Sequence, residues 1–186
     1  MNTLDAMLTR TSQGKLGFPA PGPEVLNKAF ACALRAPDHR VLRPWRYLVI
    51  EGEGLQKLGE LLVAASLAET ADLTPEVIDR LQKMPFRAPM IVVAITVYKD
   101  DPKAPPEEQL LSMGAAVQNF LLALHDQGFA SMWRSGSITG NPHLKKGLGV
   151  AAHESIAGFV YVGTASAEPR KITPLSVADF VSAWQG

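Results

Sequence analysis

The stretch that most constrains the fold of this chain runs from Gly114 to Gly136 and reads GAAVQNFLLALHDQGFASMWRSG. Its apolar first half predicts a long helix that extends to about Gln127. Gly128 suits the left-handed conformation that often ends a helix, so we expect the helix to stop there. Phe129–Trp133 then predicts a short strand, closed by a polar Arg-Ser-Gly turn. A buried helix that leads into such a strand can form the floor of a site for a flat ligand.

The composition is that of a globular protein, because 47% of the 186 residues are hydrophobic and 19% are charged. A chain of this length has room for one domain with a proper core, and we expect residues 1–186 to form it. The formal net charge is +0, so no global positive field attracts nucleic acid or anionic lipid. No apolar run approaches the length of about 18 residues that spans a bilayer, and the N-terminus lacks a signal-peptide pattern. We therefore expect a cytoplasmic protein that binds neither nucleic acid nor membrane.

The predicted strands and helices follow one another without strict β-α-β alternation, which favours an α+β fold over a doubly wound sheet. Tyr47–Ile50 and Ile156–Gly163 are rich in strand formers, and the β-branched, apolar run Met90–Val97 predicts a central strand. Beyond residue 168 we expect a turn and then a final helix or an extended arm. Besides the long helix, the pattern predicts helices at residues 3–9, 24–35, 55–69, 75–84 and about 141–148.

The helix predicted at residues 24–35 is expected to turn Leu26, Phe30 and Leu34 inward. It also holds Cys32, the only cysteine, which excludes an internal disulfide. Because Cys32 lies among apolar neighbours, we expect a buried and unreactive thiol.

The candidate functional groups are cations and hydroxyls at the ends of the predicted elements. The four histidines show no metal-ligand spacing, and no Walker loop, GxGxxG or GxSxG motif is present, so we predict no metal site. Arginine suits bidentate capture of phosphate, and serine can add a donor. Each group taken alone is better explained by a surface ion pair or a loop hydrogen bond. Together, beside Trp45 and Trp133, they point to a phosphorylated ligand with an aromatic plane; they are Arg10, Ser12, Arg35, His39, Arg43, Arg134 and Ser135.

Four short motifs follow one another in order along nearly the whole chain. They are Arg10-Thr11-Ser12, the stretch from Arg35–His39 to Arg43-Pro44-Trp45 before a strand, the stretch from Ala116–Ala123 of the long helix to Trp133–Gly136, and Gly158–Gly163. Together they resemble the motifs of the nitroreductase-like flavoprotein family, in which the first is an Arg-x-Ser phosphate motif. Arg35–His39 and Trp133–Gly136 are similar to the versions found in a small bacterial branch of NAD(P)H nitroreductases.

The resemblance implies a homodimer with an α+β fold, in which helices flank a central, mainly antiparallel sheet and two FMN sites lie at the subunit interface. In the implied site Arg10 and Ser12 hold the FMN phosphate, and Thr11 contributes its backbone. Arg35 and His39 come from the partner subunit. Trp133, Arg134 and Ser135 line the isoalloxazine, with a backbone N–H of that turn facing flavin N5. A nicotinamide nucleotide would contact the segment made of Ala123, Leu124, His125, Asp126, Gln127 and Gly128.

Two positions depart from the family pattern. Gly14 stands where relatives often have a second basic residue, and Arg43 stands where they often have glutamine before Pro-Trp. In many relatives basic residues near the C-terminus reach the phosphate, and Arg170 and Lys171 are the candidates here. Whether Arg43, Arg170 or Lys171 contacts FMN stays open at this point.

The implied activity is that of an FMN-dependent NAD(P)H oxidoreductase with ping-pong hydride transfer to nitroaromatic or quinone-like acceptors. The cofactor carries the chemistry, so no catalytic side chain is predicted. Arg35 and Arg134 are candidates to stabilise the reduced flavin near its pyrimidine end. Two alternatives remain: a flavoenzyme of the same fold with different chemistry, such as a dehydrogenase or a dehalogenase, and a non-catalytic flavin-binding protein. The sequence indicates neither the physiological acceptor nor a preference for NADH or NADPH.

Overall fold

The computed structural model, which describes residues 1–70 and 72–186, is built around an antiparallel sheet. Strands β3 (Met90–Val97) and β5 (Glu154–Ala165) pair at its centre, and β2 (Trp45–Glu51) lies on the other side of β3. Strands β4 (Ala130–Arg134) and β1 (Leu16–Gly17) each pair with β5. All of these pairings are antiparallel, which confirms the expected α+β architecture.

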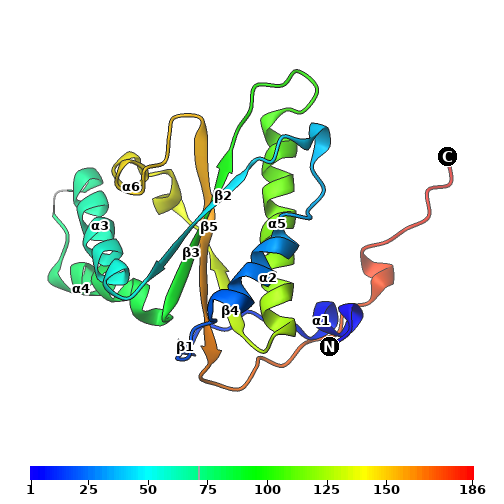
Figure 1. Cartoon of the computed structure of the whole chain (residues 1–186), viewed down its shortest axis with the longest axis horizontal. Coiled ribbons are helices and arrows are strands. Elements are labelled where there is room, and N and C mark those ends of the chain that lie inside the picture. The colour runs from blue at the N-terminus through cyan, green and yellow to red at the C-terminus, as the bar shows by residue number, and fades with distance from the viewer. Residues whose placement is uncertain (71) are drawn as a thin grey trace.

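Helices cover both faces of the sheet (Figure 1). On one face lie α2 (Pro23–Ala33) and α5 (Pro106–Asp126), and α1 (Thr3–Thr9) packs against α5. The other face carries three helices: α3 (Glu53–Glu69), α4 (Pro75–Lys83) and α6 (Pro142–Gly147). Each face therefore encloses its own apolar cluster.

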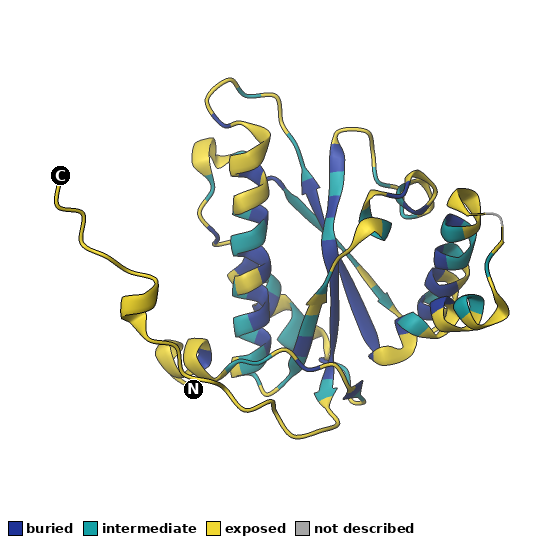
Figure 2. Ribbon diagram, turned by 180° about the vertical axis from the view of Figure 1, so that it is seen from behind, coloured by how far each residue is buried: buried dark blue, intermediate teal, exposed yellow. Residues whose placement is uncertain are grey.

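Strand β3 is apolar except for Thr96, because it is buried on both faces. Ile91, Val93 and Ile95 belong to the cluster under α3, whereas Met90 and Val92 belong to the cluster under α5. Successive side chains of a strand point to opposite faces, so only a continuous apolar run suits this position. Figure 2 shows the central strands and the inner side of α5 as the most buried parts of the chain.

The link from α5 to β4 follows the predicted plan. The last turn of α5 ends before Gly128, whose φ of 83° is the left-handed conformation expected there. Trp133 of β4 then crosses Gly158 of β5, where a Cβ would lie 2.7 Å from the Arg134 carbonyl oxygen. Gly158 has a φ of 152° and lies beside the point where the β3–β5 register shifts. Glycine is therefore required at this crossing by both space and backbone conformation.

Two expectations about α2 are wrong. The helix ends at Ala33, with Leu34 as its C-cap and 52% exposed, and the Cys32 side chain is exposed instead of buried. The reason is that the small residues Ala29 and Ala33 make the close contact with α5. Because residues four apart share a helix face, Cys32 and Leu34 on either side of Ala33 fall outside that contact.

The C-terminal segment after β5 leaves the sheet as an extended arm (Figure 1). It contains one short 3-10 turn, Val177–Asp179, so the extended alternative is correct and the helical one is not. Arg170 and Lys171 are exposed on this arm. Its large apolar side chains are also exposed: Ile172, Leu175, Val177, Phe180, Val181 and Trp184.

Candidate functional site

Arg10 lies at the end of α1, and its guanidinium has a buried nitrogen, Nη1, without a hydrogen-bond partner among the described residues. Arg10 lines a cavity of about 270 Å³, which we call the Arg10 cavity. A buried cationic donor without an acceptor is costly. Arg10 therefore brings a positive charge, with one donor unpaired among the described residues, to the wall of this cavity. Its other walls include Thr11, Gln13, His125, Gly128, Phe129 and Ser131.

The loop after α1 is held in place by Gln13, which is only 8% exposed. Its backbone N–H donates to the Ser131 carbonyl at 3.1 Å, and its side-chain Nε2 donates to Thr11 Oγ1 at 2.8 Å. Ser12 between them is exposed. Gln13 thus ties the Arg-Thr-Ser motif to β4, which explains how this motif and the segment after the long helix come together.

Arg134 and Ser135 line a second cavity, of about 300 Å³, on the other face of the sheet. We call it the Arg134 cavity. The Arg134 guanidinium carbon lies 5.5 Å from the centre of the Tyr161 ring, within the range of a cation–π contact. Burial raises the pKa of Tyr161, so its hydroxyl stays neutral at physiological pH. The cavity is closed by Leu58, Leu62, Met84, Arg87, Ile138 and Phe159.

The two cavities lie on either side of β4 and are linked by the loop around Gly14. A Cβ placed on Gly14 would lie 3.8 Å from Arg134 Nη2 and 3.8 Å from Met132 Sδ. Residues 10–14 therefore pass from the Arg10 cavity to the guanidinium of Arg134. The chain brings Arg10 and Arg134 to one edge of the sheet, but it does not place them in one cavity.

Trp133 faces away from Arg134, because neighbouring residues of a strand point to opposite faces. Its indole Nε1 donates to the Ala157 carbonyl at 3.2 Å, and 38% of the side chain is exposed. The Trp133 side chain lines neither the Arg10 cavity nor the Arg134 cavity. From the sequence we expected Trp133 and Arg134 to line one wall of the site. In the structure their side chains point to opposite faces of β4.

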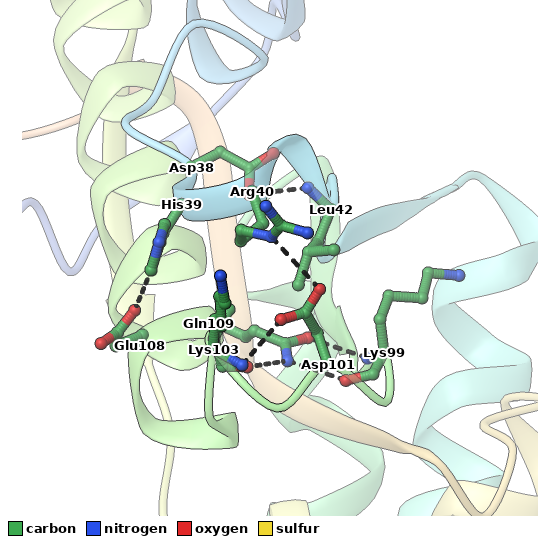
Figure 3. A network of polar contacts seen from close by, with 10 residues as sticks. Asp38, His39, Arg40, Leu42, Lys99, Asp101, Lys103, Glu108 and Gln109 are labelled. Atoms are coloured by element: carbon green, nitrogen blue, oxygen red, sulfur yellow. Dashed lines mark hydrogen bonds and ion pairs between the residues drawn. The ribbon is translucent and has the colours of Figure 1, made fainter.

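Arg35 and His39 lie away from both cavities. Arg35 lines a groove of about 380 Å³ between α1, α2 and α5, which also includes Cys32 and Asn119 and which we call the Arg35 groove. His39 stands near the start of α5, with its Nδ1 2.7 Å from a carboxylate oxygen of Glu108 (Figure 3). The chain itself therefore does not bring Arg35 or His39 to Arg10 or Arg134.

The loop that carries His39 has strained backbone angles and is held in place by polar contacts. Arg40 and Arg43 have φ angles of 69° and 52°, values that residues other than glycine seldom adopt. Asp38 accepts the backbone N–H of Arg43 at 2.7 Å. It also accepts the backbone N–H of Leu42 at 3.1 Å, and Arg40 pairs with Asp101 at 3.5 Å (Figure 3). Arg43 is exposed in this loop, remote from the Arg10 cavity.

The segment Ala123–Gly128 divides among three environments. Leu124 is fully buried in the core, whereas Ala123 and Asp126 line the Arg35 groove. His125 and Gly128 line the Arg10 cavity, and the Gln127 side chain donates to the Ala123 and Val25 carbonyls. Burial lowers the pKa of His125, and the positive charge of Arg10 lowers it further, whereas the negative charge of Asp126 raises it by less. The His125 imidazole is therefore neutral at pH 7.

Sequence reasoning missed Arg87 and Tyr161, which line the Arg134 cavity. Arg87 ends a 3-10 turn, Met84–Arg87, just before β3, and its position between two prolines resembles an ordinary surface loop. The available signal was an arginine at the end of an element, the same signal that singled out Arg10 and Arg134.

Among the described residues no group of three or more His, Cys, Asp or Glu side chains is arranged to hold a metal ion. In the same part of the chain, no helix has the length and apolar character needed to cross a membrane.

Sequence comparisons connect this chain to known proteins over most of its length. The family described as "Nitroreductase family" matches residues 18–164. "Putative NAD(P)H nitroreductase YdjA" of Escherichia coli (strain K12) is 36% identical over 164 residues, which cover 88% of each chain. A "Putative NAD(P)H nitroreductase" of Haemophilus influenzae is 36% identical over 186 residues, with 98% of this chain and 99% of the relative covered.

Solved structures show the same fold at lower identity. A nitroreductase-like family protein from Bacillus cereus has a TM-score of 0.85 at 20% identity, covering 100% of this chain and 97% of the other. The FMN and NADPH-dependent nitroreductase NfnB from sphigopyxis sp. strain HMH has a TM-score of 0.79 at 20% identity, with 100% of both chains covered. These likenesses confirm the predicted nitroreductase-like fold.

Proposed function

Because this chain belongs to the nitroreductase family, we propose that it is an FMN-dependent NAD(P)H oxidoreductase. It takes a hydride from NADH or NADPH and passes reducing equivalents to a nitroaromatic or quinone-like acceptor in a ping-pong sequence. The observation that carries the proposal is Arg10, which lines a cavity and whose buried Nη1 has no partner among the described residues. The whole chain acts as one FMN-binding domain in the cytoplasm, where NAD(P)H is regenerated.

Arg10 and its neighbours would hold the FMN phosphate. A phosphate oxygen at the Arg10 cavity would accept from Nη1 and remove the cost of leaving that donor unpaired. Thr11 lines the same cavity, and the exposed hydroxyl of Ser12 is free to turn toward the ligand. The neutral imidazole of His125 adds no positive charge to this wall, so Arg10 supplies the charge there.

The end of β4 would hold the ring system. Arg134 and Ser135 line the Arg134 cavity, and Gly136 after them has a φ of 129°, which lets the turn aim its backbone N–H groups outward. When bound there, FMN would supply the redox chemistry, with its N5 as the site of hydride transfer. The protein supplies orientation and positive charge, and the Trp133 indole offers an exposed aromatic surface beside the turn.

A second copy of the chain would complete each site. Arg35 and His39 do not reach the Arg10 or Arg134 cavity of their own chain, so we propose that they serve the flavin of the partner in a homodimer. The outer side of α1 and α5 supports this arrangement, because it exposes large apolar residues: Leu4, Met7, Leu8, Leu110 and Leu111. The nicotinamide nucleotide would approach along Ala123–Gly128, part of which lines the Arg10 cavity.

The first experiment is to purify the protein and record its visible spectrum before and after incubation with FMN. We expect flavin absorbance that co-elutes with the protein on gel filtration at the size of a dimer. A colourless protein that does not retain added FMN would overturn the proposal.

Anaerobic stopped-flow mixing with NADH and NADPH separates the proposal from its alternatives. Bleaching of the flavin by either nucleotide supports an NAD(P)H oxidoreductase, whereas no bleaching by both indicates a flavoenzyme with other chemistry. Turnover with a panel of quinones and nitroaromatics then tests for an open acceptor site. Complete inactivity of a protein that does bleach favours a flavin-binding protein without an acceptor.

A further inference from the structure

The Arg134 cavity holds a second arginine that the family motifs did not indicate. Arg87 reaches the cavity from the 3-10 turn before β3, while Arg134 reaches it from the end of β4. Tyr161 of β5 lines the same cavity, and both guanidinium charges lower the pKa of its hydroxyl against the larger effect of burial. Two cations from separate elements therefore converge on one aromatic side chain.

Neither cation is neutralised within the chain. The residues that line the Arg134 cavity include no carboxylate, and among the described residues neither Arg87 nor Arg134 forms an ion pair. Like charges that share a cavity repel each other, and an anionic or electron-rich group between them removes that cost. The charge distribution of the cavity therefore fits a ligand that carries, or gains, negative charge.

The remaining walls fit the edge of a flat ring. Leu58 and Leu62 of α3 lie on one side, and Phe159 and Tyr161 of β5 form the floor. The volume of about 300 Å³ is at the lower limit of small-molecule sites, which suits one end of an extended planar ligand. Apolar walls with two cations at the rim match a heterocycle with polar atoms along one edge.

We propose that Arg87 is the second cation at the ring end of the site, and that it faces the pyrimidine edge of the isoalloxazine together with Arg134. The inference rests on the proposed function. Transfer of a hydride converts NAD(P)H to NAD(P)⁺ and leaves the ring system with one additional negative charge. Two guanidinium groups at that edge stabilise the reduced form more than the oxidised one. The sequence assigned this role to Arg134 and to Arg35, which would come from the partner subunit; Arg87 is a cation of the same chain as Arg134 and lines the same cavity.

The test compares FMN reduction potentials in Arg87→Gln, Arg87→Lys and the control Arg80→Gln. Arg80 is an exposed cation on the neighbouring helix α4 that does not line the cavity. We expect Arg87→Gln to lower the affinity for reduced FMN relative to oxidised FMN about tenfold, which equals a potential about 30 mV more negative. Arg87→Lys should keep most of the wild-type potential because it keeps the charge, and Arg80→Gln should not change it.

The outcomes separate this inference from the proposed function. FMN binding is first measured for the wild type by quenching of flavin fluorescence, and absence of binding overturns the proposed function and the inference together. If the wild type binds FMN but Arg87→Gln and Arg80→Gln have the same potential, the inference about Arg87 is wrong and the proposed function stands. Circular dichroism confirms folding, and Arg87→Met, which also removes the charge but keeps an unbranched stem, replaces Arg87→Gln if the glutamine variant does not fold. Its potential must then be more negative than that of Arg80→Gln.

Discussion

Replacement of Arg10 by methionine should weaken FMN binding without loss of stability in the ligand-free protein. Methionine keeps an unbranched apolar stem but removes the guanidinium. In the free chain Arg10 Nη1 is buried and has no partner among the described residues, and such a group costs about 1–3 kcal/mol. Removal of that donor therefore relieves an unfavourable term when no ligand is bound, and removes a favourable one when phosphate is bound.

The expected size of the effect follows from the same contact. A hydrogen bond to a charged group contributes about 1.5–3 kcal/mol, and about 1.4 kcal/mol corresponds to a factor of ten in affinity. Arg10→Met should therefore raise the Kd for FMN by about 10- to 150-fold. The free energy of unfolding of the ligand-free variant should equal or exceed that of the wild type. Fluorescence titration gives the Kd, and urea denaturation of the apoprotein gives the stability.

Arg80→Met provides the matched control, because Arg80 is exposed on α4 and lies outside the Arg10 cavity. It should leave both quantities within experimental error of the wild type. If Arg10→Met instead destabilises the apoprotein by more than about 1 kcal/mol and leaves FMN affinity unchanged, Arg10 is a structural residue. The phosphate site would then have to lie elsewhere.

Two further predictions concern the sheet that positions the site. The Arg46 guanidinium lowers the pKa of Glu154 from its ordinary value of 4.5 to about 2, so this pair stabilises the fold above about pH 5 and loses its effect as the pH falls toward 2. The difference in unfolding free energy between wild type and Glu154→Gln should accordingly shrink over that range in pH-dependent denaturation, and a constant difference would contradict the assignment. Gly158→Ala should destabilise the protein by about 2 kcal/mol or more through backbone strain and displacement of Trp133. By contrast Gly140→Ala, at an exposed position where a Cβ meets nothing within 4 Å, should change stability by less than about 0.5 kcal/mol in the same urea assay, and equal effects of the two substitutions would refute the argument.

The parts of the fold that the sequence predicted well are those fixed by local pattern. The run Met90–Val97 is a strand with the predicted bounds, because only a strand buried on both faces needs eight consecutive apolar or small residues. Gly128 ends α5 as expected, because the left-handed conformation there is a local requirement. The error at Cys32 has a tertiary cause: the tight approach of α2 to α5 at Ala29 and Ala33 decides which side of α2 is buried.

The site was less predictable than the fold, since its residues meet through contacts that no local pattern encodes. Arg10, Arg35 and Arg134 were singled out because arginines at element ends suit a phosphorylated ligand, yet they line three different cavities. The link between two of them depends on the hydrogen bond from Gln13 to Ser131, 118 positions apart in the chain. Arg87 was missed because its relation to Arg134 exists only across the sheet.

The separation of Arg10 from Arg35 gives the strongest test of a shared site. If each flavin uses Arg10 of one subunit and Arg35 of the other, both Arg10→Met and Arg35→Gln homodimers have two damaged sites. A mixed dimer of the two variants has one site with both arginines intact and one with neither, because the subunits are related by a two-fold axis. Random exchange of subunits between equal amounts of the two variants makes half of the dimers mixed, and should therefore restore tight FMN binding to about a quarter of all sites. A mixture in which the subunits do not exchange should show no tight sites. Light scattering establishes that both variants are dimers, and titration before and after exchange measures the recovery. No recovery after complete exchange would mean that Arg10 and Arg35 do not meet at a common flavin.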